Sequence, residues 1–196
     1  MFRGTIKVAK GSAVNPNPNV QSHAVIAAYQ TLKMPTACIW EPVDGIGHAA
    51  VFIRPAAGIE RALDTEGYAS WFPGGDGAGP SDILPTRMVE SEKSSFFDDC
   101  CSEAGDSGTE EEDYRLPEHM IPLPNLRMVD MLAEWTSIRT KPGSHYRLMR
   151  KNCSTIAARV IRAGLNKKQH LSVLKKAHQV WWTPNDVLKL AQSLAN

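Results

Sequence analysis

The chain has 196 residues, of which 42% are hydrophobic and 22% are charged, and its formal net charge at pH 7 is +1. This length suits a single domain spanning residues 1–196 with a sizeable core, and it is short for two domains. The near-neutral charge indicates neither a nucleic-acid nor a membrane partner, and no apolar stretch approaches the ~20 residues of a membrane span. Residues 1–15 lack the zones of a secretory signal, so we expect synthesis in the cytoplasm and no cleaved leader.

The first half of the chain predicts a short antiparallel sheet. An Asn- and Pro-rich start, up to about residue 18, predicts an arm or loop, and residues 20–32 suit either a strand or a short helix. Two apolar runs at residues 37–40 and 49–53 have the composition of strands joined by a Pro- and Gly-containing turn. A third strand is expected within residues 67–72, where Pro and Gly follow.

Two segments of opposite charge follow in the sequence. Residues from about 75 to 118 are rich in Gly, Ser and acidic residues, which predicts a mobile insertion, with a lid over a cleft as the alternative. Residues 139–176 are strongly basic, which is typical of a solvated helical face and also suits an anionic substrate or surface. The last part of the first segment, residues 103–118, is strongly acidic and could attract the basic residues 139–176.

The second half predicts a strand and several helices. Residues 120–124 resemble a strand, after which Asn125 is expected to cap a helix whose Met and Trp residues recur at three- and four-residue steps. The run Thr183-Pro184-Asn185-Asp186 supplies an N-cap, a first-turn proline and a first-turn acid, so the last helix is expected to begin there.

One cysteine is placed where a helix begins. Asn152-Cys153-Ser154 precedes an amphipathic run that ends at Gly164, so Cys153 is expected in the first helical turn. The unpaired N–H groups of that turn favour an anion and lower a thiol pKa from its usual ~8.5. His48 stands at the entry of a predicted strand, and a thiolate nucleophile needs a base that the fold brings near. The two residues together predict a Cys/His hydrolase, whereas two core residues are the structural alternative.

A polar neighbour of His48 would fix the tautomer that faces the thiol. Asp64, Glu66 and Ser70 are the candidates, because the turn after the His48 strand permits a residue between 64 and 70 to lie beside it. The other cysteines have neither disulfide-framework nor CxxC spacing, so we expect no zinc site, and no metal or cofactor. The vicinal pair Cys100-Cys101 is interpreted as an incidental or redox-labile pair in a polar loop.

Four stretches of the sequence resemble the permuted NlpC-type, papain-like cysteine hydrolases of bacterial effector toxins, notably those delivered by type VI secretion. They are GHAAV, YASWFPG, IPLP and YRLMRKNCST at residues 47–51, 68–74, 121–124 and 146–155. Histidine precedes cysteine here, the reverse of ordinary papain-like enzymes, as a circular permutation would produce. The resemblance implies an α+β fold with an antiparallel sheet packed against helices, Cys153 as nucleophile, His48 as base and Ser70 as third catalytic residue. The acidic insertion is longer than the family pattern needs.

The resemblance also implies a function and its partners. We expect a secreted antibacterial amidase or endopeptidase that cleaves peptidoglycan stem peptides in the periplasm of a target cell, with an immunity protein and a secretion-apparatus carrier as partners. The first alternative is a papain-like protease, deamidase or acyl hydrolase acting in the host cytosol, because one fold hosts several activities. The second is a non-catalytic binding module, in which Cys153 belongs to the core and the basic helices bind an acidic partner.

Overall fold

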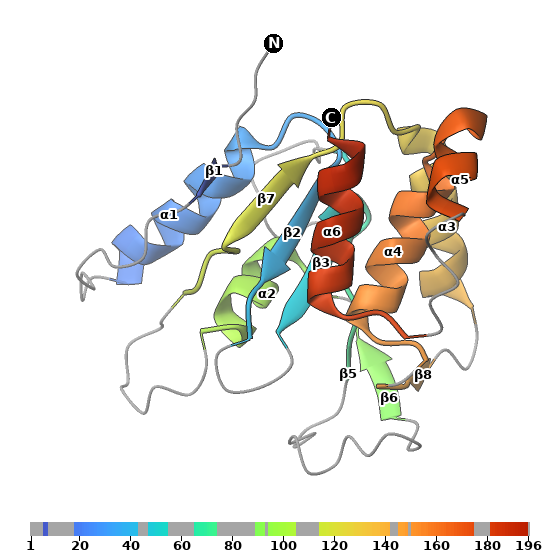
Figure 1. The fold of residues 1–196 in the computed structure, drawn as a ribbon. Coiled ribbons are helices and arrows are strands. Elements are labelled where there is room, and N and C mark those ends of the chain that lie inside the picture. Colours follow the sequence, from blue (N-terminus) through green and yellow to red (C-terminus); the bar gives the residue numbers. More distant parts are fainter. Residues whose placement is uncertain are drawn as a thin grey trace.

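The structure of the chain is a computed structural model. A five-stranded antiparallel sheet lies at its centre (Figure 1). The structure describes residues 6–7, 18–42, 47–54, 65–73, 89–92, 94–104, 114–141, 145–148, 150–174 and 181–195. In spatial order the strands are β1 (Ile6–Lys7), β7 (His119–Pro122), β2 (Thr36–Trp40), β3 (His48–Phe52) and β4 (Tyr68–Ala69). A second, three-stranded sheet contains β5 (Phe72–Pro73), β6 (Val89–Glu92) and β8 (His145–Tyr146).

Helices cover both faces of the large sheet. The described helices are α1 (Pro18–Thr31), α2 (Phe96–Ser102), α3 (Met128–Thr140), α4 (Cys153–Ala163), α5 (Lys167–Leu174) and α6 (Pro184–Leu194), and all but α5 contribute to the two cores. Successive side chains of a strand point to opposite faces, so β2 and β3 supply two separate cores. Ile39 and Val51 pack with α3, α4 and α6, whereas Trp40 and Phe52 pack with α1 and α2. The predicted α+β class is therefore confirmed.

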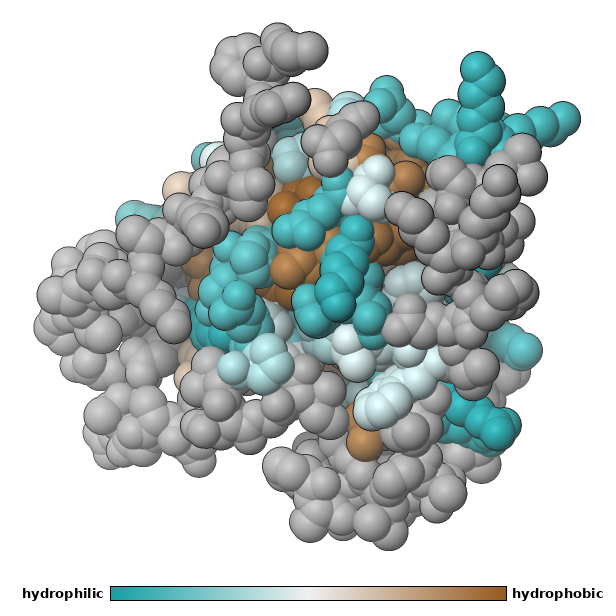
Figure 2. Space-filling model, in the orientation of Figure 1, coloured by the Kyte–Doolittle hydropathy of each residue, from teal (hydrophilic) through white to brown (hydrophobic). Residues whose placement is uncertain are grey.

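Amphipathic patterning explains how α6 attaches to the sheet. Thr183 and Asp186 form a reciprocal capping box at its start, as the sequence predicts. Val187 and Ala191 are buried against the sheet, while Lys189 is exposed. Near α6, Figure 2 shows hydrophilic residues at the surface with hydrophobic residues behind them. Within the described part of the chain, no helix has the length and apolar character needed to cross a membrane.

Several predicted elements are confirmed and others need correction. The runs at residues 37–40 and 49–53 form the antiparallel pair β2 and β3, and residues 20–32 lie almost entirely in helix α1. The expected third strand is divided between β4 and β5, which belong to different sheets. Asn125 does not cap α3, because the helix begins at Met128 after Arg127, whose side chain makes no capping bond. The N-terminal arm falls largely outside the described residues.

The acidic segment contains an ordered helix, which corrects the expectation of a mobile insertion for that part. In α2, Phe96 and Cys100 are buried in the core that α1 also covers. Ser95 caps the helix, and the Asp98 carboxylate accepts a hydrogen bond from the Ser95 backbone N–H at 2.9 Å. Cys100 therefore does not lie in a polar loop. Much of the expected insertion, including residues 74–88 and 105–113, lies outside the described residues.

A glycine turns the chain into β3. Gly47 has φ of +71°, a conformation that L side chains rarely adopt. A Cβ atom at this position would lie 2.6 Å from the Trp40 carbonyl oxygen and 2.9 Å from the Pro42 nitrogen. Both atoms are backbone, so they cannot move aside without moving the strand. Gly47 thus fixes the direction in which the next residue, His48, enters the sheet.

Candidate active site

Cys153 is the first residue of α4, as the sequence predicts. Asn152 is the N-cap, and its side-chain oxygen accepts a hydrogen bond from the Thr155 N–H at 2.8 Å. The amide nitrogen of the same side chain donates to the carbonyls of Leu148 and Trp182 at 2.8 and 3.0 Å. These bonds tie the start of the cysteine helix to the segments before α4 and before α6. Cys153 itself is 6% exposed.

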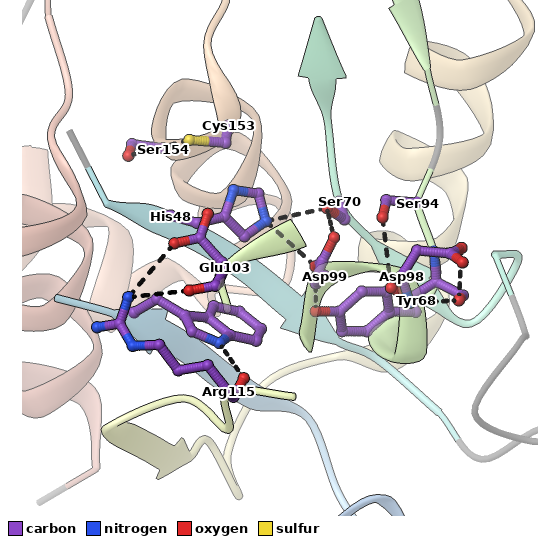
Figure 3. A network of polar contacts seen from close by, with 12 residues as sticks. His48, Tyr68, Ser70, Ser94, Asp98, Asp99, Glu103, Arg115, Cys153 and Ser154 are labelled. Atoms are coloured by element: carbon purple, nitrogen blue, oxygen red, sulfur yellow. Dashed lines mark hydrogen bonds and ion pairs between the residues drawn. The ribbon is translucent and has the colours of Figure 1, made fainter. Parts of the chain in front are cut away.

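His48, the first residue of β3, lies between the start of α4 and the helix α2 (Figure 3). One edge of its imidazole faces Cys153, and the opposite edge carries Nε2 toward Ser70 and Asp99. The ring stacks on Phe72, with ring centroids 4.4 Å apart and an interplanar angle of 26°. His48 is 2% exposed, so the imidazole is held by packing as well as by hydrogen bonds.

A buried carboxylate and a hydroxyl share the Nε2 edge of His48. Nε2 lies 3.0 Å from Oγ of Ser70 and 3.1 Å from Oδ2 of Asp99. The Ser70 hydroxyl donates to Oδ1 of Asp99 at 2.9 Å, so its oxygen is available to accept from Nε2. Both contacts place the imidazole proton on Nε2. The neutral ring therefore presents an unprotonated Nδ1 on the edge that faces the thiol.

Electrostatics favour an ionised pair of Cys153 and His48. Burial raises the pKa of the Cys153 thiol, but the charge and hydrogen bond of His48, a backbone hydrogen bond from Ala49 and the Ser154 hydroxyl outweigh it and lower the pKa overall. Burial lowers the pKa of His48, whereas Asp99 and Cys153 raise it to well above its usual value. The opposed shifts are those of a thiolate next to an imidazolium.

The buried cysteines of the opposite core behave differently. Burial raises the pKa of Cys38 and of Cys100, and the charge of Asp99 raises both further. Burial and neighbouring negative charge are the largest causes at these thiols, in contrast to the His48 charge that lowers the pKa of Cys153, so they stay protonated. All four cysteines are free, and the described residues include no group of His, Cys, Asp and Glu side chains that could hold a metal ion.

The structure brings together Cys153, His48 and Ser70, and it adds Asp99, which sequence reasoning missed. Of the other candidates, Glu66 is exposed and pairs with Arg139 at 3.2 Å, and Asp64 lies outside the described residues. Asp99 was overlooked because its segment is acidic and lacks long apolar runs. The available signal was Ser95 followed three residues later by Asp98, a capping pattern around two phenylalanines.

An ion pair borders the site at the end of α2. Glu103, the C-cap residue, lies 3.7 Å from Arg115, which also binds Glu118 at 2.7 Å (Figure 3). Burial raises the pKa of the Glu103 carboxyl, and the charges of His48 and Arg115 oppose that shift. Acidic residues of the segment 103–118 thus pair locally with Arg115, whereas the expected attraction to the basic segment would involve residues that are partly outside the described ranges.

Comparisons with known proteins each match part of the chain. A family model described as the IcsB middle domain matches residues 121–196. A multifunctional-autoprocessing repeats-in-toxin protein of Vibrio vulnificus is 34% identical over 74 residues, which are 38% of this chain and 1% of that protein. No solved structure matches significantly. Of the four residues of the candidate site, the family match includes only Cys153, because His48, Ser70 and Asp99 precede residue 121.

Proposed function

We propose that the protein is a cysteine hydrolase in which Cys153 is the nucleophile and His48 is the base. Asp99 orients the imidazole of His48 and stabilises its protonated form. The observation that carries this proposal is the arrangement around one imidazole. Its Nδ1 edge faces a thiol at a helix start, and its Nε2 lies 3.1 Å from a fully buried carboxylate. Ser70 takes the role of a hydroxyl that bridges His48 and Asp99, at 3.0 and 2.9 Å.

The reaction would proceed through an acyl-enzyme. The Cys153 thiolate attacks a carbonyl carbon, and the backbone N–H of Cys153 at the free start of α4 donates to the developing oxyanion. The His48 imidazolium then gives its proton to the leaving amine or alcohol, which departs and leaves a thioester. Neutral His48 next removes a proton from water, whose hydroxide oxygen attacks the thioester. Collapse releases the acid and restores the Cys153 and His48 pair.

A permuted papain-like fold is part of the proposal. It is supported by the order of the two side chains, with His48 on a strand that precedes the helix of Cys153. It is also supported by the antiparallel arrangement of the strands and the packing of α4 against β3. The thiolate and imidazolium then meet between a helix start and a sheet edge, as the sequence resemblance implies.

We further propose that the protein acts as a secreted effector or toxin inside a target cell. The similarity to a repeats-in-toxin protein and to the IcsB middle domain supports this role. These matches favour the alternative of a host-directed papain-like enzyme over cleavage of peptidoglycan stem peptides. The cell-wall substrate, the immunity protein and the secretion carrier remain predictions from the resemblance.

Acyl-enzyme trapping tests the chemistry. The wild-type protein and the Cys153→Ala variant are incubated with a series of p-nitrophenyl esters, and the intact mass and the labelled peptide are determined. We expect one acyl group on Cys153, and turnover that is lost in Cys153→Ala but kept in the control Cys101→Ala. Labelling elsewhere, or turnover that survives in Cys153→Ala, contradicts the proposal. A protein that forms no adduct fits the binding-module alternative.

A substrate comparison tests the target. Wild-type protein and Cys153→Ala are each incubated with purified peptidoglycan and with a eukaryotic cell lysate, and products are identified by mass spectrometry. We expect Cys153-dependent changes in lysate components and intact stem peptides. Cys153-dependent release of wall fragments would instead restore the antibacterial prediction.

A further inference from the structure

A second hydroxyl, that of Tyr68 in β4, reaches the candidate site in addition to the hydroxyl of Ser70. Tyr68 is fully buried, and its hydroxyl donates to Oδ2 of Asp99 at 2.5 Å. The tyrosine is anchored by the sheet, because it pairs with Phe52 of β3 in the antiparallel register. Its ring also meets the Phe96 ring of α2 edge-on, with centroids 5.9 Å apart and an interplanar angle of 89°. Tyr68 thus contacts both the carboxylate and the helix that carries it.

Three polar side chains contact the carboxylate of Asp99, two of them from the β4 segment and one from β3. Oδ1 accepts from Ser70 at 2.9 Å, whereas Oδ2 accepts from Tyr68 at 2.5 Å and lies 3.1 Å from Nε2 of His48. A buried charge is tolerated only when it is paired and hydrogen-bonded. Tyr68 and His48 both contact Oδ2 of Asp99, so the tyrosine determines which carboxylate oxygen lies beside the imidazole.

We propose that Tyr68 is a positioning residue, whose hydroxyl holds Oδ2 of Asp99 against Nε2 of His48 and thereby maintains the thiolate and imidazolium pair of Cys153 and His48. This inference rests on the proposed function, because it assigns to Tyr68 an effect on the reacting groups that it exerts only through Asp99. Burial and the charge of Asp99 raise the pKa of Tyr68 well above its usual value, so the phenol remains a donor throughout the working pH range.

The direction of the effect follows from the charges. Tyr68→Phe removes the hydroxyl and keeps the ring that packs on Phe96. Asp99 then loses the donor that holds Oδ2 beside Nε2, so the carboxylate can move away from the imidazole and is more easily protonated, and either change reduces the negative charge next to Nε2. The imidazolium loses its proton at lower pH, and Cys153, with less positive charge beside it, ionises at higher pH. The pH range in which both groups are charged therefore narrows from both sides.

The experiment measures the thiolate of Cys153 directly. Absorbance at 240 nm is followed against pH in the wild type, in Tyr68→Phe and in Cys153→Ala as the blank, and the pH profile of kcat/KM is recorded with a p-nitrophenyl ester. We expect the pH midpoint at which the thiolate forms to rise, the kcat/KM profile to narrow, and kcat/KM to fall about tenfold at neutral pH, the size typical of a hydrogen bond to a charged group. An unchanged midpoint of thiolate formation in folded Tyr68→Phe overturns the inference.

A matched control separates positioning from packing. Tyr29 packs on Phe96 in the same core, with ring centroids 5.6 Å apart, and Tyr29→Phe removes a hydroxyl that is not among the donors to Asp99 in the described structure. For Tyr29→Phe we expect the pH dependence of the 240 nm absorbance and of kcat/KM to match that of the wild type. Changes of the same size in Tyr29→Phe and Tyr68→Phe would assign the effect to core packing instead.

A double-mutant cycle tests whether Tyr68 acts through Asp99. In the background of Asp99→Asn the buried charge is gone, so adding Tyr68→Phe is expected to change the pH midpoint of thiolate formation and kcat/KM little further. Additive losses in the two backgrounds contradict an action through Asp99. The proposed function fails by a different result, namely turnover that persists in Cys153→Ala, so the two failures are distinguishable.

Discussion

The two helices that flank His48 differ in how openly the sequence displays them. Helix α4 has an Asn cap, a regular apolar face and a glycine at its end, and it lies within the segment that resembles the IcsB middle domain. Helix α2 is only seven residues long, lies in an acidic segment and falls outside that match, yet it contributes Asp99. A nucleophile can be recognised from its local setting, whereas the group that orients its base is defined by tertiary contacts alone.

The largest expected effect compares two neighbouring carboxylates of α2. Asp99→Asn removes the charge that supports the His48 imidazolium, and we expect kcat to fall by about 10²- to 10⁴-fold, as for other orienting aspartates. Asp98→Asn weakens only the capping box with Ser95, so we expect kcat to stay within about twofold and the free energy of unfolding to fall by about 1 kcal/mol. Esterase kinetics and urea unfolding measure both. Similar kcat losses in the two variants would remove the distinction between the residues.

Thiol reactivity compares the two cores next. The charge and hydrogen bond of His48 lower the pKa of Cys153, so we expect its thiolate to persist to lower pH than that of an ordinary thiol, whereas burial raises the pKa of Cys38 and Cys100. An ordinary thiol loses about tenfold in alkylation rate per pH unit below its pKa. Between pH 8 and 6 we expect a much smaller loss for Cys153 with iodoacetamide, and no labelling of Cys38 before unfolding, as mapped by peptide mass. A tenfold loss per unit at Cys153 would falsify the ionised pair.

Backbone conformation gives the next effect. In Gly47→Ala the methyl group meets backbone atoms at φ of +71°, so we expect a loss of about 2 kcal/mol or more in the free energy of unfolding. In Gly164→Ala the new Cβ lies 2.7 Å from Cγ of the flexible Met131 side chain, and the backbone is right-handed. We therefore expect Gly164→Ala to lose less free energy of unfolding than Gly47→Ala. Urea unfolding compares the two, and a larger loss at Gly164 would show that the strand entry is not constrained as described.

The smallest expected effect concerns the two helix caps. Asn152→Ala and Thr183→Ala each remove a side-chain N-cap, which typically costs about 1 kcal/mol. Only Asn152 also joins the start of α4 to the Trp182 carbonyl. We therefore expect Asn152→Ala to lose somewhat more stability than Thr183→Ala, and Asn152→Ala alone to slow the alkylation of Cys153. Equal alkylation rates in the two variants would limit Asn152 to an ordinary cap.

The sequence predicts those parts of the fold that local chemistry determines. The apolar runs of β2 and β3, the start of α4 at Cys153 and the capped α6 are each found near the expected residues. The predicted N-cap of α3 is wrong, because Asn125 has a side chain suited to capping but lies in a turn before the helix. Local preference for a cap is weak beside the packing that decides where a helix starts.

The candidate site is predictable to the same extent. Cys153 and His48 carry local signals, and Ser70 was found through its place in a resembling strand. Asp99 lies 51 positions from His48, and sequence separation of this kind gives no indication of contact. The acidic composition of its segment also favours disorder, which the buried phenylalanine and cysteine of α2 outweigh.

The position of His48 between helices from the two sides of the sheet has a consequence for inhibition. Phe96 and Tyr68 pack together in the core that α1 and α2 cover, whereas α4, which begins at Cys153, packs in the core on the opposite face of the sheet. If the proposed function holds, displacing α2 would remove the Asp99 carboxylate from His48 and lower activity without any modification of the thiol.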